Sequence, residues 1–454
     1  MKRSGYLLFD IVVAVVLLLL ASYNMVWGAA GYVLLYIWQV RRLFHEEKKI
    51  LKDRTSLISF NFFFFLMFSL CTYIIPVVVI LGMDEEIKLL TQSYYTSKYI
   101  PYSMFLCAIA VAFYSTGYLR GLNKQTLSNT PKPIKNFRGI LILSNVFAFI
   151  ITVIFAITLI RAKAAGEMDI AGNVTTLVDC FIILPIALCG YMNQFYHYNL
   201  IQFVKKYWFI LSCSLFIVIT MLSIGDRFMT IVLLTPLVYI INTYVYRFSK
   251  LQIISALVLG FFFMFLISFT RGRTSLSDGV SDFRESDNKL VLFQDVYPAN
   301  KCLIIGTEAR IEQGLYKPLK IFSVALTPIP FLPSIIKNAF FEGEYSSTMY
   351  ITEICRKKSN IGESGTGTQV VTDIFVSWGL IGVAFFFYLI GRIIGKLYRN
   401  KSSVFYYIAY VGFVTWSFYI PRQSLFDPYR DVVWMLAILY VLCHLKPNHV
   451  NKQG

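Results

Sequence analysis

The chain has 454 residues, of which 57% are hydrophobic and 15% are charged, and its 42 Lys and Arg against 25 Asp and Glu give a formal net charge of +17. Soluble domains contain about 45–50% apolar and about 25% charged residues, so this composition excludes a soluble enzyme and a disordered chain, and the recurring apolar runs exclude a receptor with one anchor. A basic chain can indicate a nucleic-acid partner, but in a membrane protein the surplus first reflects topology, because Lys and Arg gather in cytoplasmic loops.

The apolar runs predict an all-α polytopic membrane protein with about twelve transmembrane helices. A helix needs about 20 apolar residues to cross the hydrocarbon core. Candidate spans lie near 6–22, 25–40, 57–82, 101–119, 139–160, 173–192, 207–224, 228–246, 251–270, 368–391, 403–420 and 432–445. The start Met1-Lys2-Arg3 is typical of a signal peptide, but a second span follows the first at once, so we expect an uncleaved first helix.

The distribution of basic residues orients these helices. With the N-terminus in the cytoplasm, the inside loops hold 23 Lys and Arg, the short outside loops hold 7, and the long outside segment 271–367 holds the other 12. Long segments are exempt from the positive-inside rule. The orientation therefore rests on the 23 basic residues in the inside loops against the 7 in the short outside loops. Both termini are therefore expected in the cytoplasm.

The long extracytoplasmic segment divides the chain into three expected parts. Residues 1–270 contain nine helices, residues 271–367 form the segment, and residues 368–454 contain three helices and a cytoplasmic tail. Structureless loops longer than about 12–15 residues are uncommon. Leu303–Gln313 and Pro318–Phe341 are amphipathic or apolar, and they predict helices that lie on the membrane or re-enter it.

Cysteine and histidine indicate no cofactor. No Cys/His cluster has zinc spacing, and no Gly-rich phosphate loop ending in Lys-Ser/Thr occurs, so we predict neither a metal site nor an ATPase site. Cys302 and Cys355 share the long segment and could form a disulfide in an oxidising compartment.

Charged residues at the outer membrane level are the first functional candidates, because ionisable groups at membrane depth are costly. Asp226-Arg227 could instead form an interfacial ion pair, and other arginines could simply snorkel. Arginine binds phosphate in a bidentate manner and keeps its charge. The outer arginines together predict a site for an anionic headgroup such as a lipid pyrophosphate: Arg227, Arg271, Arg273, Arg422 and Arg430.

A glycine-containing segment leads into the helix that begins near Val370. Gly365 and Gly367 allow backbone N–H groups to approach a ligand, and a helix N-terminus favours anions; a flexible entry loop is the alternative. Asp373, one turn into the helix, is the carboxylate best placed to face a cavity. Asp179 and Asp10 are also membrane-embedded, but Asp10 lies near the inner end and is discounted.

These features occur in an order that resembles a known family. Gly225-Asp226-Arg227 is followed by a short cytoplasmic connection, a span ending in Arg271 and the long outer segment. The segment closes with Gly365-Thr366-Gly367-Thr368-Gln369 and continues to Trp378-Gly379-Leu380-Ile381-Gly382. From Gly225 to Leu445 the chain resembles Wzy-type oligosaccharide repeat-unit polymerases, which build O-antigen and capsule chains.

The resemblance implies a GT-C-like, metal-independent glycosyltransferase of the bacterial cytoplasmic (inner) membrane. Its substrates would be undecaprenyl-pyrophosphate-linked oligosaccharides, which it would polymerise at the outer face into the surface polysaccharide of lipopolysaccharide or capsule, with a chain-length regulator protein as a further partner. On matching positions, Arg227 and Arg271 would contact the pyrophosphate, and Arg273, Arg422 and Arg430 would add substrate contacts. Related O-antigen ligases rely on a His in the long outer segment; this segment has none, which favours a polymerase.

The expected chemistry needs charge stabilisation more than a general acid, because pyrophosphate is a good leaving group. Preorganised arginines supply that stabilisation, and a carboxylate base activates the acceptor hydroxyl. Asp226 is slightly favoured, although the positive charge beside it would make it a weaker base. The candidate bases are Asp226, Glu308, Glu312, Glu363 and Asp373.

Two other classes stay open. An O-antigen ligase or another lipid-linked glycosyltransferase would share the architecture, and a flippase for the same lipid-linked sugars would suit twelve spans. Transporters often have repeated halves with broken helices near the midplane. The sequence shows no such repeat, and its unexpected charges gather at one face, which favours the enzyme.

Overall fold

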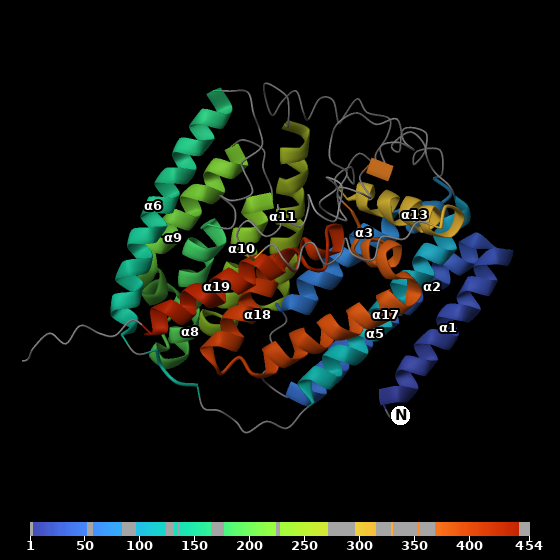
Figure 1. The fold of residues 1–454 in the computed structure, drawn as a ribbon, viewed down its shortest axis with the longest axis horizontal. Coiled ribbons are helices and arrows are strands. Elements are labelled where there is room, and N and C mark those ends of the chain that lie inside the picture. Colours follow the sequence, from blue (N-terminus) through green and yellow to red (C-terminus); the bar gives the residue numbers. More distant parts are fainter. Residues whose placement is uncertain are drawn as a thin grey trace, which may run out of the picture. The chain divides into compact units, whose positions relative to one another are not determined.

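The structure is a computed structural model and describes residues 3–51, 58–83, 97–123, 131–134, 136–164, 177–223, 228–270, 296–314, 328–329, 353–354 and 368–444. Every regular element in these ranges is a helix, as predicted (Figure 1). The elements are α1 (Arg3–Tyr23), α2 (Met25–Leu51), α3 (Phe60–Ile80), η2 (Ser97–Tyr99), α5 (Ile100–Leu122), α6 (Phe137–Ala164), η3 (Asp179–Ile183), α8 (Leu184–Tyr196), α9 (Leu200–Ser223), α10 (Phe228–Ile240), η4 (Ile241–Val245), α11 (Lys250–Thr270), α13 (Tyr297–Glu312), α17 (Val370–Arg399), α18 (Val404–Trp416), η6 (Ile420–Arg422) and α19 (Asp427–His444).

Six of the described helices are long and apolar enough to cross a membrane. They run over Gly5–Tyr23, Phe60–Ile80, Ile100–Leu122, Phe137–Thr158, Leu200–Leu222 and Val370–Arg399. Each of the twelve expected spans overlaps a described helix, and four of the remaining ones are shorter apolar helices. The fold is therefore that expected of a helical membrane protein, and the number of crossings stays a prediction.

Apolar side chains form an exposed stripe along α1. Leu8, Val12, Val16 and Leu19 are all exposed and follow one another at intervals of three or four residues, which places them on one helix face. A large exposed apolar surface marks contact with a membrane or a partner. On a helix of this length and hydropathy, lipid accounts for the stripe.

The chain forms two compact units, each built from segments far apart in the sequence. The first unit comprises Met1–Thr126, Ser277–Arg399 and Trp416–Arg430, and the second comprises Leu127–Leu276, Asn400–Thr415 and Asp431–Gly454. The candidate catalytic and substrate-binding residues that the structure describes all belong to the first unit.

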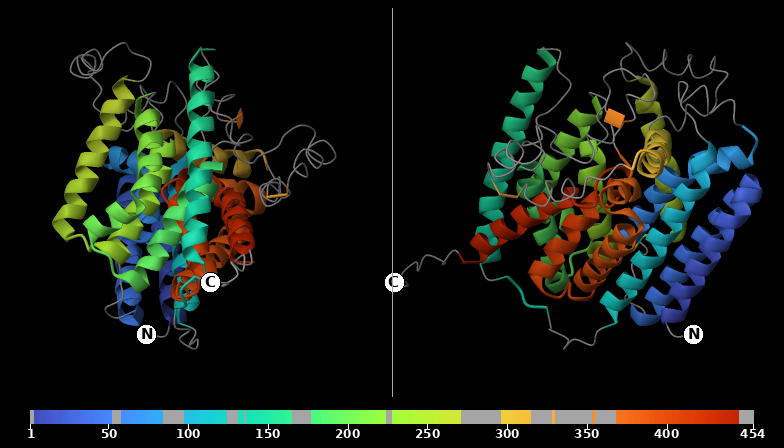
Figure 2. Two further views of the ribbon diagram at one scale, coloured as in Figure 1. Left: turned by 90° about the vertical axis from the view of Figure 1, so that its left-hand side faces the viewer. Right: turned by 45° about the vertical axis from the view of Figure 1, so that its right-hand side comes forward.

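In the first unit, α5 and α17 lie side by side in close contact (Figures 1 and 2). Gly117 and Gly121 of α5 face Gly391 and Gly395 of α17, so each helix presents two glycines four residues apart. A methyl group on Gly121 would lie 2.5 Å from the carbonyl oxygen of Arg392, and the other three glycines leave even less room. Pairs of small residues at this spacing let membrane helices approach until their backbones touch.

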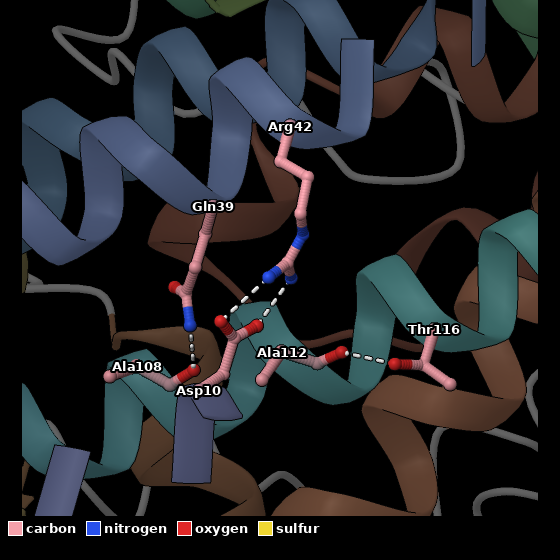
Figure 3. A network of polar contacts seen from close by, with 6 residues as sticks. All are labelled: Asp10, Gln39, Arg42, Ala108, Ala112 and Thr116. Atoms are coloured by element: carbon pink, nitrogen blue, oxygen red, sulfur yellow. Dashed lines mark hydrogen bonds and ion pairs between the residues drawn. The ribbon is translucent and has the colours of Figure 1, made fainter. Parts of the chain in front are cut away.

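Buried polar contacts also tie α1, α2 and α5 together. Arg42 forms a bidentate ion pair with Asp10, with Nη1 at 2.7 Å from Oδ1, and both side chains are almost fully buried (Figure 3). Beside the pair, Gln39 Nε2 donates to the carbonyl oxygen of Ala108 at 3.2 Å. Asp10, which the sequence analysis discounts as a catalytic group, is therefore occupied by a buried structural ion pair.

The second unit contains two turns of the same design, which join α8 to α9 and η4 to α11. In each turn an asparagine side chain accepts a backbone N–H from the turn, and a polar N-cap residue exchanges hydrogen bonds with a glutamine three residues later, which is a capping box. The asparagines are Asn193 and Asn242, and the box pairs are Asn199 with Gln202 and Ser249 with Gln252.

Candidate functional site

The N-terminus of α17 is held by Gln369, the last residue of the glycine-containing motif. The Oε1 atom of Gln369 accepts the backbone N–H groups of Val371 at 2.7 Å and Thr372 at 3.2 Å. Its Nε2 atom donates to Thr72 Oγ1 of α3 at 3.3 Å. The sequence left open whether this helix N-terminus binds an anion or follows a flexible loop; in the structure two of its N–H groups are bonded to the side chain of Gln369.

The turn that carries Arg422 lies beside the same motif. Thr368 donates its backbone N–H to the carbonyl oxygen of Arg422 at 3.3 Å, and η6 packs against α3 and α17. The Arg422 side chain is half-buried. Two segments that the sequence assigned to one site, about 50 residues apart, are therefore neighbours.

Helix α13 brings part of the long segment into the first unit. It packs against α3, α5 and α17 and runs at an angle to the last two (Figure 1). Residues 299–309 are all buried, so protein surrounds three turns of this helix. The expected stretch Leu303–Gln313 falls on α13, which begins six residues earlier and is largely buried in protein. Except for Pro328 and Ile329, the second expected stretch lies outside the described residues.

Three buried ionisable residues lie on the two packed helices α13 and α17. Asp373 is fully buried, Lys301 is 3% exposed and Glu308 is 7% exposed. Gly306 of α13 permits the close packing, because a methyl group there would overlap the Thr372 side chain. Ionisable groups buried in a membrane protein are functional candidates by default, and here they accompany the predicted base Asp373.

The first half of α17 ends at a backbone break. Gly379 has φ +64° and ψ −162°, a conformation that only glycine adopts readily. Arg310 Nη2 of α13 lies 3.6 Å from the position that a Cβ of Gly379 would take. A positive charge at the C-terminal end of the half-helix Val370–Trp378 is favourable to its dipole. Arg310 therefore lies at the C-terminal end of the half-helix that carries Asp373 near its start.

Glu312, one of the predicted bases, has partners outside the spans. Lys98 Nζ lies 3.3 Å from Glu312 Oε1, and the Tyr99 hydroxyl donates to the same oxygen. The hydrogen bond to Tyr99, followed by that to Glu312, raises the pKa of Lys98. The hydrogen bond to Glu312, followed by burial, raises the pKa of Tyr99. These contacts use Glu312 to fasten α13 to the start of α5, which makes it a poorer candidate base than Asp373.

The predicted site residues divide into three groups. Asp373 and Arg422 belong to neighbouring segments of the first unit. Arg430 is half-buried at the start of α19. The remaining predicted residues lie outside the described residues: Asp226, Arg227, Arg271, Arg273, Glu363, Gly365 and Gly367.

Sequence reasoning missed three contributors. Lys301 and Arg310 were counted only as part of the basic content of the long segment, although their position on an apolar stretch was a usable signal. The capping role of Gln369 depends on a turn geometry that the sequence does not reveal. Among the described residues, no group of three or more His, Cys, Asp and Glu is arranged to hold a metal ion.

Comparisons of the chain with protein-family models, curated proteins and solved structures find no match.

Proposed function

We propose that the chain is a membrane glycosyltransferase that polymerises oligosaccharide repeat units carried on a lipid pyrophosphate, such as undecaprenyl pyrophosphate. It would act at the outer face of a bacterial cytoplasmic membrane with about twelve spans, a GT-C-like architecture and both termini in the cytoplasm. The surface polysaccharide is the product, and a chain-length regulator protein is the expected partner.

One observation carries the proposal: the hydrogen bond from Thr368 N–H to Arg422 O. It makes neighbours of the motif that precedes α17 and the late arginine turn, which the resemblance assigns to one substrate site. Asp373 follows one turn later and is fully buried. A permanent cation, a preorganised turn and a nearby carboxylate are the parts that the proposed transfer needs.

The transfer is a displacement at the anomeric carbon of the donor chain. The acceptor hydroxyl oxygen forms the new glycosidic bond, and the bond from the anomeric carbon to the phosphate oxygen breaks, so the lipid pyrophosphate leaves with the electron pair. Arg422, together with Arg227 and Arg271, stabilises the charge on the leaving group. Asp373 takes the acceptor proton.

Reconstitution in liposomes tests the proposal. The purified chain receives lipid-pyrophosphate repeat units, and the products are separated on a gel. A ladder with the spacing of one repeat unit supports polymerisation. Transfer to a different lipid acceptor would instead identify a ligase, and passage of lipid-linked sugar across the bilayer without bond formation would identify a flippase.

The flippase alternative is favoured by one structural feature, the break at Gly379. Discontinuous helices are typical of substrate sites in transporters, and α17 breaks at Gly379, where its buried first segment ends. In the proposed enzyme the same break orients the Asp373 half-helix, so the liposome experiment distinguishes the two roles.

A further inference from the structure

We infer that the first unit holds an ordered water molecule at the proline in α3, where it links α3, α5 and α13. This inference is independent of the proposed function. A small cavity at this point is lined by three polar residues, Thr72, Ser103 and Asn300, and by apolar residues that include Pro76. The space suits about one water molecule.

Pro76 removes the usual hydrogen-bond donor of one backbone carbonyl. It lies inside α3, and proline has no N–H, so the carbonyl of Thr72, four residues earlier, cannot receive its usual helical hydrogen bond. This carbonyl belongs to a residue that lines the cavity. Buried backbone acceptors are almost always satisfied, and ordered water is one of the groups that satisfies them.

Asn300 supplies the second acceptor. Its side chain is 1% exposed, and its Nδ2 group donates to Leu70 O at 2.9 Å. Its Oδ1 atom is buried and has no hydrogen-bond partner in the described structure. Since the amide nitrogen is occupied, the oxygen is the polar atom of Asn300 left to face the cavity.

The hydroxyl groups complete the coordination of a water molecule. Ser103 Oγ donates its hydrogen to Tyr99 O at 2.8 Å or to Thr307 Oγ1 at 3.2 Å, and its lone pairs remain available. Thr72 Oγ1 accepts from Gln369 Nε2, so its own hydrogen can be donated. Water can donate to Asn300 Oδ1 and Thr72 O while it accepts from Thr72 Oγ1, which meets the two to four bonds that a buried water needs.

The site has a structural consequence for the α17 N-terminus. Thr72 contributes both to the water site and to the hydrogen bond with Gln369. The water therefore supports the orientation of the threonine that anchors the Gln369 cap. Loss of the water would loosen α13 from α3 without removing any charged group.

Hydroxyl-radical footprinting by X-ray irradiation tests the inference on the intact protein. Radiolysis of a bound water oxidises neighbouring side chains, and methionine is readily converted to its sulfoxide. Met104 lines the cavity and is 1% exposed, whereas Met67 of the same unit packs in an apolar cluster and is 6% exposed. We expect Met104 to be oxidised several-fold faster than Met67, although it is less exposed.

Substitution provides the matched control. Asn300→Leu removes Oδ1, the acceptor without a partner, and Pro76→Ala restores an N–H that can donate to Thr72 O. Either change should lower the oxidation rate of Met104 to that of Met67. Equal oxidation of Met104 and Met67 in the unaltered protein would overturn the inference without reference to any variant. An unchanged Met104 rate in a folded Asn300→Leu protein would also overturn it.

Discussion

The backbone and the side chain of Arg422 have separate roles. Its carbonyl oxygen accepts the bond from Thr368 N–H, while its side chain is half-buried and stays available to a ligand. A side-chain substitution therefore removes the charge and keeps the backbone bond. The side chain's contribution to transfer can be measured separately from the folding of the turn.

Arg422→Ala should lower polymer synthesis by about 10²-fold or more, the usual cost of losing one preorganised charge-stabilising donor. Arg422→Lys should recover part of the activity, because lysine keeps the charge but not the bidentate geometry. Polymer formed per minute by the purified variants is the measurement. Arg392→Ala, an exposed arginine on the other half of α17, is the control and should remain active; equal losses in both variants would contradict the assignment.

Asp373→Asn and Glu312→Gln compare two of the three described carboxylate candidates, Glu308 being the third. Removal of a general base costs about 10²–10⁴-fold, and the amide fits the same space, so activity should fall while the folded protein is retained. Glu312→Gln should cost far less, since Glu312 holds Lys98 and Tyr99. Rates of bond formation, measured beside thermal unfolding, test this. The opposite ranking of the two variants would make Glu312 the base.

The sequence leaves open whether Cys302 and Cys355 form a disulfide. Cys302 is buried and packs with Ile305 and Ile354, and Cys355 lies outside the described residues. Mass spectrometry of unreduced protein from an oxidising compartment distinguishes linked cysteine peptides from two separately alkylated ones.

At the scale of helices, hydropathy predicts where most helices lie in the sequence. It does not predict which helices pack against each other. Each expected span overlaps a helix because long apolar runs carry a strong signal. The start of α13 escaped prediction, since its polar residues Asn300 and Lys301 are buried by other helices rather than by an apolar face of its own. The pairing of α5 with α17 could not be predicted either, because the four glycines show their packing role only once these two helices, far apart in the sequence, are in contact.

Gly117→Ala should disrupt this helix pair. The added methyl group would collide with the carbonyl oxygen of Tyr388, and rigid backbone cannot yield as a side-chain end can. Overpacking typically costs about 1–3 kcal/mol, so we expect a clear loss of thermal stability in detergent. Gly260→Ala in α11 is the matched control, because a Cβ there meets nothing within 4 Å. Equal melting temperatures for the two variants would contradict close packing at Gly117.

At the scale of the whole molecule, the +17 net charge separates into two roles. Most basic residues lie on the predicted cytoplasmic side, where they would orient the helices, whereas a few arginines on the predicted outer side mark the proposed substrate site. Chemistry and spacing in the sequence pointed to Asp373 and the Arg422 turn, and their role in the site stays a prediction. Lys301 and Arg310 gave only a weak signal, their position on an apolar stretch, because their surroundings depend on how α13 crosses α17.

The stoichiometry of bond formation tests the central claim most directly. The purified protein is supplied with one defined lipid-pyrophosphate repeat unit, and mass spectrometry quantifies both the joined chains and the released lipid pyrophosphate. A polymerase that uses this donor releases one lipid pyrophosphate for each new glycosidic bond, and every product chain keeps one lipid. Unchanged substrate from active, folded protein, or joined chains without released lipid pyrophosphate, would contradict the proposal.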